Sequence, residues 1–244
     1  RFGAALPEAE VVNVIQRLDD ALFLESDKFR GVQDRAVRSF AKLRVRPAAH
    51  AGSAYHSDPD DLRSSLRATF TKDGEPGPVG AYFGEEGGRT SGGRICAALA
   101  PHIDPLRGAS CYAWTYKAIA EQCDADLFVV LGVAHQATKN LFVPLPMSYT
   151  TSLGTMSADH DFMAGLNKRC PIDAGEDILI HRGEHSIEFQ AVYLKYVYEN
   201  RRDVSIAPIL CGNLSDFVPL GTDPMHVPEV NDFIGALRET ISGC

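Results

Sequence analysis

Histidine and acidic side chains lie at places in the sequence where a metal site or an enzyme could use them. His102 and Asp104 lie in one short segment, His135 lies in a second, and Glu184 and His185 lie in a third. Two neutral imidazoles and one anionic ligand, with coordination positions left open, suit non-haem iron or another divalent ion. A further histidine and glutamate would then be free to act as acid and base.

The elements that must position these residues follow from the alternation of apolar and amphipathic segments. Short apolar runs predict strands over Ile95–Leu99, Asp126–Leu131 and Val204–Leu210. The predicted helices between and after them are Gly108–Cys123, Ala158–Cys170, Ser186–Glu199 and Val227–Ile241. This alternation predicts an α/β fold with a central, mostly parallel sheet and helices on both faces.

Two of the histidines occupy equivalent positions, because His102 and His135 each follow a predicted strand. Loops past the carboxyl ends of parallel strands meet at one sheet edge, so the imidazoles can converge there. Each residue also has a purely structural interpretation. A single histidine after a strand can be a hydrogen-bonded loop residue, Ser186 can cap the following helix, and Asp104 can cap a turn.

The first 45 residues differ from the rest of the chain. Apolar residues at helical spacing follow Pro7, and a charged helical stretch covers about Ser26–Leu43. We therefore expect an N-terminal helical extension over residues 1–45 and an α/β domain over 46–244. Residues 70–93 are rich in glycine and proline, which predicts a mobile loop with at most one short strand.

Composition excludes several functional classes. The chain has 244 residues, 45% hydrophobic and 23% charged, which is typical of a globular protein. A net charge of −8 disfavours nucleic-acid binding, and no apolar run reaches the roughly 20 residues that cross a membrane. Six cysteines without a Cys-x-x-Cys pair, and an N-terminus unlike a signal peptide, predict a cytoplasmic protein.

Five strings of residues, in the same order along the chain, resemble the Memo family, which is also called AmmeMemoRadiSam system protein B. The resemblance covers about Val45 to Leu214. The strings are Ala49-His-Ala-Gly-Ser-Ala-Tyr55, Ala100-Pro-His102, Leu131-Gly-x-x-His135, Gly183-Glu-His-Ser-Ile-Glu188 and Ile206-x-Pro-Ile-Leu210.

The resemblance implies a fold similar to the class III extradiol ring-cleaving dioxygenases, with a metal bound by His102 and His135. It also implies a third ligand further along the chain, a cysteine in the eukaryotic protein. The chain departs from the family pattern at Ala54, where members have Trp, and at Gln136, where many have a second histidine. We expect the family's C-terminal part, with its third ligand, to lie beyond Cys244.

The resemblance further implies that His185 lines the metal pocket and acts as acid and base, with Glu184 orienting it. We take His50 and Asp104 as candidate substrate-binding residues.

Two functions compete. One is a non-haem iron(II) or copper protein with dioxygenase-like oxidoreductase activity on a small molecule; zinc is less expected, because no His-Glu-x-x-His motif is present. The other is a non-catalytic module that binds a peptide or a protein. We expect no nucleic-acid or membrane partner, and we consider a homo-oligomer possible.

Overall fold

The computed structural model describes residues 7–88 and 93–243. The chain divides into two compact units, Arg1–Lys42 and Leu43–Cys244. The first unit holds α1 (Glu8–Asp20) and α2 (Asp27–Ala41). α1 begins directly after Pro7, and α2 begins where the Ser26 side chain accepts a hydrogen bond from the Phe29 N–H at 3.3 Å. Both helices lie within residues 1–45, where the sequence predicts a helical extension.

The second unit is built on a six-stranded sheet with the strand order β1-β4-β5-β6-β2, with β3 paired to β6. β2, at one edge of the sheet, is parallel to β6, with Leu127 level with Ser205 and Val133 level with Cys211. β5 is also parallel to β6, whereas β3 is antiparallel to it. The strands are β1 (Val45–Arg46), β2 (Leu127–Val133), β3 (Phe142–Pro144), β4 (Ser148–Thr151), β5 (Gly154–Ala158) and β6 (Ser205–Cys211).

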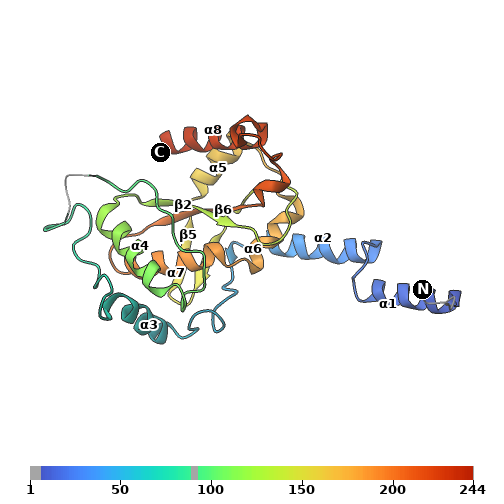
Figure 1. Ribbon diagram of the computed structural model, residues 1–244, viewed down its shortest axis with the longest axis horizontal. Coiled ribbons are helices and arrows are strands. Elements are labelled where there is room, and N and C mark those ends of the chain that lie inside the picture. Colours follow the sequence, from blue (N-terminus) through green and yellow to red (C-terminus); the bar gives the residue numbers. More distant parts are fainter. Residues whose placement is uncertain (1–6, 89–92, 244) are drawn as a thin grey trace. The chain divides into compact units, whose positions relative to one another are not determined.

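Helices flank the sheet, as the predicted α/β fold requires (Figure 1). On one face α7 packs on β2, where the rings of Phe128 and Tyr198 lie 5.7 Å apart. On the other face α5 and α8 form an apolar core with β6 and β3, in which Phe142 and Phe233 stack at 3.8 Å. The helices are α3 (Pro59–Thr71), α4 (Ala109–Gln122), α5 (His160–Arg169), α6 (Ile180–Gly183), α7 (Ser186–Tyr198) and α8 (Pro228–Ser242).

Gly132 allows α7 to approach the sheet closely. A Cβ atom at this position would lie 2.5 Å from the Ile187 side chain and 2.7 Å from the Ser186 hydroxyl oxygen. Since real Cβ atoms do not approach other atoms so closely, a larger residue would push the start of α7 away from β2. The close contact therefore fixes the helix start beside the end of β2.

The predicted strand Ile95–Leu99 is wrong. Residues 93–103 form no helix or strand; the Ile95 N–H instead donates to the Gln122 carbonyl at the end of α4. Leu99 is 98% exposed. The alanines of this segment bury little apolar area, so pairing along the sheet edge would gain little. β1, β3, β4 and β5 were not predicted.

The described part of the chain contains no helix long and apolar enough to cross a bilayer.

Candidate metal centre

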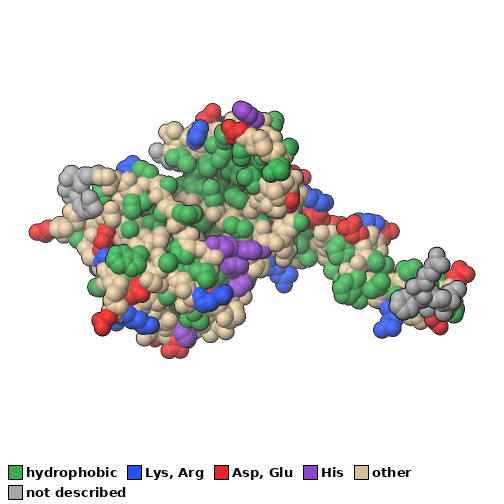
Figure 2. Space-filling view, in the orientation of Figure 1, with side chains coloured by type: hydrophobic (Ala, Val, Ile, Leu, Met, Phe, Trp, Pro, Cys, Tyr) green, Lys and Arg blue, Asp and Glu red, His purple; other side chains and the backbone are tan. Residues whose placement is uncertain are grey.

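Three histidines from different segments converge on one point. His102, His135 and His185 each offer a ring nitrogen, and these nitrogens lie within 4.8 Å of one another. The ring centroids are 4.9 Å apart for His102 and His135 and 4.7 Å apart for His135 and His185. Histidine side chains form one surface patch beside hydrophobic side chains (Figure 2). The predicted convergence of His102 and His135 is confirmed, and His185 joins them.

The tautomer of His135 follows from its partners. Its Nδ1 atom lies 2.9 Å from the Glu184 carboxylate, so Nδ1 carries the proton and donates it. The Nε2 atom of His135 therefore carries a lone pair, and it lies 3.0 Å from Nε2 of His102. A neutral imidazole with a free Nε2 lone pair is the form that binds metals, and a carboxylate on the other nitrogen fixes its orientation.

Glu184 connects the segments that carry two of the histidines. One of its oxygens accepts hydrogen bonds from the backbone N–H groups of His185 at 2.8 Å and Ser186 at 3.0 Å. The other accepts from the His135 N–H at 3.1 Å and from its ring. Burial raises the pKa of Glu184, but these hydrogen bonds outweigh burial and hold the pKa below its usual value. The carboxylate thus stays charged.

His185 precedes the first turn of α7 and remains a neutral imidazole near pH 7. Burial is the largest influence on its pKa and lowers it, and the neighbouring His135, His102 and His50 lower it further. The Glu184 carboxylate opposes this but does not reverse the direction. Neutral imidazole is the state that donates to a metal ion.

Ser186 does not cap α7, contrary to one interpretation of the sequence. Its hydroxyl accepts a hydrogen bond from the Val133 N–H and donates one to the Val133 carbonyl, both at 3.0 Å. The residue at the cap position is His185, whose side chain makes no capping hydrogen bond. Ser186 therefore joins α7 to the end of β2, two residues before His135.

His102 is positioned by side chains and not by a strand. Gln190 of α7 donates to the Pro101 carbonyl at 3.2 Å, and the Tyr112 hydroxyl of α4 donates to the Ile103 carbonyl at 2.9 Å. The Tyr116 hydroxyl donates to the Gln190 side-chain oxygen at 2.7 Å and orients the amide. These contacts hold the peptide groups on both sides of His102.

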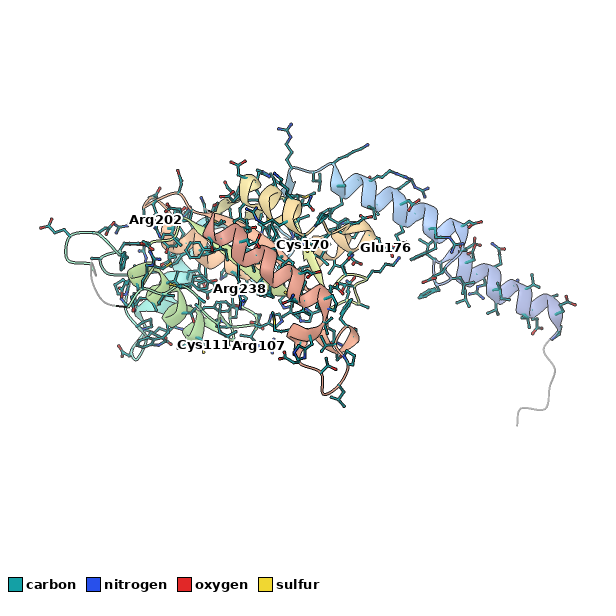
Figure 3. All side chains as sticks on the ribbon, turned by 90° about the horizontal axis from the view of Figure 1, so that it is seen from above. Arg107, Cys111, Cys170, Glu176, Arg202 and Arg238 are labelled. Atoms are coloured by element: carbon teal, nitrogen blue, oxygen red, sulfur yellow. The ribbon has the colours of Figure 1, made fainter. Side chains whose placement is uncertain are left out.

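The two candidate substrate-binding residues have different surroundings. His50 lies at the site, with its ring centroid 5.7 Å from that of His185 and its Nε2 atom 2.9 Å from the Gly183 carbonyl. Asp104 forms an ion pair with Arg107. Arg107 lies just before α4 (Figure 3). Hydrogen bonds from the backbone and the side chain of Arg107 lower the pKa of Asp104. Asp104 thus makes the turn contacts that the structural interpretation predicts.

A buried ion pair that the sequence analysis missed supports the His50 segment. The side chains of Arg46 and Glu188 are fully buried and form a salt bridge. Glu188 also accepts hydrogen bonds from the His50 N–H at 3.0 Å and from the Tyr55 hydroxyl at 2.6 Å. Arg46 donates to the Glu184 carbonyl at 2.7 Å. Glu188 lies in the Gly183–Glu188 string that resembles the Memo family, and this string was the available signal.

Among the described residues, no cysteine joins the three-histidine cluster. Cys211 ends β6, and burial raises the pKa of its thiol to about 11, so it stays protonated near pH 7. Cys170 lines a separate cavity of about 240 Å³ beside α8. Cys244 lies outside the described residues.

The fold and site define an α/β protein with a candidate metal centre made of three histidines. Comparison with known proteins agrees with this class. The profile of the family described as Memo-like protein matches residues 46–218. The chain therefore belongs to the Memo family, which confirms the resemblance found in its sequence.

Individual relatives carry the same family name. The chain is 30% identical to a MEMO1 family protein of Aquifex aeolicus over 210 residues, 86% of this chain and 51% of the relative. It is 34% identical to a MEMO1 family protein of Thermococcus kodakarensis over 170 residues, 69% of this chain and 53% of the relative. The chain spans about half the length of these curated relatives.

Proposed function

We propose that the chain binds a single metal ion through His102, His135 and His185. The observation that carries this proposal is the convergence of their ring nitrogens within 4.8 Å. Three imidazoles leave coordination positions open for a small molecule. The Glu184 carboxylate on Nδ1 of His135 is the supporting contact that histidine ligands commonly have.

We propose iron(II) or copper as the metal, and an oxidoreductase of the dioxygenase type as the activity. Imidazole donors suit iron, copper and zinc alike, so the donor set fits the proposed metals. A bound ion would supply Lewis-acid and redox chemistry. Zinc hydrolysis has less support, since the sequence has no His-Glu-x-x-His helix.

The protein's own residues take three roles in this proposal. His185 is a ligand here, which replaces the acid–base role that the resemblance implies for it. Glu184 is a positioning residue, because hydrogen bonds engage both of its oxygens. His50 lies next to the ligands and is the better-placed contact for a substrate, whereas the Asp104 carboxylate is engaged by Arg107.

Oxygen consumption tests the activity. Protein loaded anaerobically with iron(II), and in parallel with copper, is mixed with a panel of catechols in air-saturated buffer. We expect oxygen uptake that depends on both metal and catechol and that is lost in His135→Ala. If fully loaded protein consumes no oxygen with any catechol, the dioxygenase-type activity is refuted while the metal site is not.

A non-catalytic binding module is the second candidate, and exposed apolar side chains favour it. Ile103, Leu106, Leu131 and Val133 stand close in sequence to His102 and His135 and are 37%, 66%, 51% and 46% exposed. Apolar surface of this kind is typical of sites that bind proteins or peptides. The test measures the affinity for a library of apolar peptides with and without bound metal. Equal affinities in the two forms of the protein would favour this candidate.

We also propose a cytoplasmic location. The five described cysteines, Cys96, Cys111, Cys123, Cys170 and Cys211, are free thiols, which supports a reducing compartment.

A further inference from the structure

Helix α1 exposes an apolar stripe. Val11, Ile15 and Leu18 recur at helical spacing and are 41%, 51% and 39% exposed, and α1 has no buried residue. An isolated helix of 13 residues is only marginally stable in water, so packing of its apolar face must supply the stability. The family match begins at residue 46, so α1 and α2 lie outside it.

Three apolar residues of α2 mirror the stripe of α1 about the midpoint of the connection between Asp20 and Asp27. Each residue of the α1 stripe has an apolar counterpart at the same distance from that midpoint in α2. The matched pairs are Val11 with Ala36, Ile15 with Val32, and Leu18 with Phe29. Such symmetry allows two copies of the segment to align in antiparallel fashion with these three pairs facing one another.

Within one chain these pairs do not meet. α1 and α2 follow one another lengthwise and do not fold back on each other (Figures 1 and 3). Phe23, in the connection, is 78% exposed. The matched residues of α1 are therefore exposed, whereas Phe29, Val32 and Ala36 of α2 are half-buried.

The charges of the two helices are also complementary. α1 carries four acidic residues and one arginine, whereas α2 carries four basic residues and two aspartates. Among the described residues, a single ion pair joins the helices, between Lys28 and Asp20 at 2.7 Å. One carboxylate oxygen of Asp19 is buried without a hydrogen-bond partner in the described structure. Lys28 is the residue of α2 that mirrors Asp19.

We propose that residues 8–41 are a homodimerisation arm, in which two copies pair antiparallel so that α1 of each lies against α2 of the other. A two-fold axis through the connection makes the interface self-complementary, as in most homodimers. The acidic α1 disfavours the alternative of a membrane surface, because anionic headgroups attract basic segments. This proposal does not depend on the metal site.

Sedimentation equilibrium of the full chain tests whether the apolar stripe of α1 forms a dimer interface. We expect a dimer in the wild type, and a dimer dissociation constant raised at least about tenfold in Ile15→Asp and in Leu18→Asp. Val12→Asp is the matched control, since Val12 is 57% exposed on the same helix but lies outside the matched pairs. A wild type that stays monomeric at all concentrations, with or without vesicles of anionic lipid, overturns the proposal.

Charge reversal tests the pairing itself. One variant carries Glu10→Lys and Asp19→Lys in α1, and the other carries Lys28→Glu and Arg38→Glu in α2. We expect each alone to be mostly monomeric and an equimolar mixture to form the heterodimer. Dimers that persist in both single variants, or a mixture that stays monomeric, refute the α1–α2 pairing between copies.

Discussion

The Nε2 atoms of His102 and His135 lie 3.0 Å apart, although 33 positions separate the two residues. The Glu184 carboxylate accepts a hydrogen bond from His135 Nδ1–H, which orients the ring so that Nε2 faces His102. Together with His185, these atoms form a set of convergent donors. Several residues outside that set fix its geometry, and each can be tested separately.

Glu184→Gln should weaken metal binding by roughly 10- to 100-fold. Both oxygens of Glu184 accept from N–H groups, so the NH2 of glutamine must face one pair of donors. Facing His135, it forces the ring proton onto Nε2; facing His185 and Ser186, it disturbs the start of α7. Isothermal titration with iron(II) under anaerobic conditions measures the change. Glu176→Gln is the control, because Glu176 pairs with Lys139 at the surface. Equal affinity of both variants would contradict the role assigned to Glu184.

Tyr112→Phe should lower metal affinity by releasing the Ile103 carbonyl beside His102. The ring stack with Tyr193, at 4.3 Å and 5°, would remain, so we expect a stability loss of only about 1 kcal/mol. Tyr193→Phe removes a hydroxyl from the same stack but none of the hydrogen bonds to residues 101–103, and it should leave affinity unchanged. Similar affinities in the two variants would refute positioning by the Tyr112 hydroxyl.

Glu188→Gln should destabilise the fold by about 3–5 kcal/mol, because it leaves Arg46 buried without its ionic partner. Urea unfolding gives the free energy. Glu199→Gln is the matched control: Glu199 pairs with Arg63, whose side chain is 36% exposed, so we expect a loss of at most about 1 kcal/mol. A small effect of Glu188→Gln would show that the buried pair does not hold this segment.

Much of the fold could be predicted from the sequence, because most helices and the two long strands have local apolar patterns. The continuous apolar run over residues 126–131 predicts the strand β2 and places His135 just after it, but the burial that such a run predicts on both faces is wrong, because β2 is an edge strand with Leu131 and Val133 about half exposed. β4 and β5 are short, and their serine, threonine and glycine residues lack such a pattern. These strands are stabilised by pairing with other strands. A local sequence pattern does not predict such pairing.

Parts of the site could not be predicted for the same reason. His102 is held by Tyr112 and Gln190, which lie on two different helices. Arg46 and Glu188 are 142 positions apart, and only the folded chain brings their charges together. Contacts of this kind depend on tertiary packing, so residue types and spacing identify the candidates but not their partners.

Stability should fall as the pH decreases from about 6.5 to 4. Burial lowers the pKa of His181 from 6.5 to about 4, and its ring bonds to the Tyr149 hydroxyl and the Val143 carbonyl. The unfolded chain takes up this proton first, so stability is complete above pH 6.5 and about 2 kcal/mol lower at pH 5. Urea unfolding at several pH values should show a weaker dependence in His181→Gln. An identical dependence in both proteins would contradict this assignment.

Metal binding by single-histidine variants tests the central claim most directly. Protein purified without chelators is reconstituted anaerobically with iron(II) or copper(I), and bound metal is measured by elemental mass spectrometry. We predict one equivalent in the wild type and in His226→Ala, an exposed control histidine, and loss of bound metal in His102→Ala, His135→Ala and His185→Ala. A wild type that binds no metal, or a His185→Ala variant that retains a full equivalent, would contradict the three-histidine site.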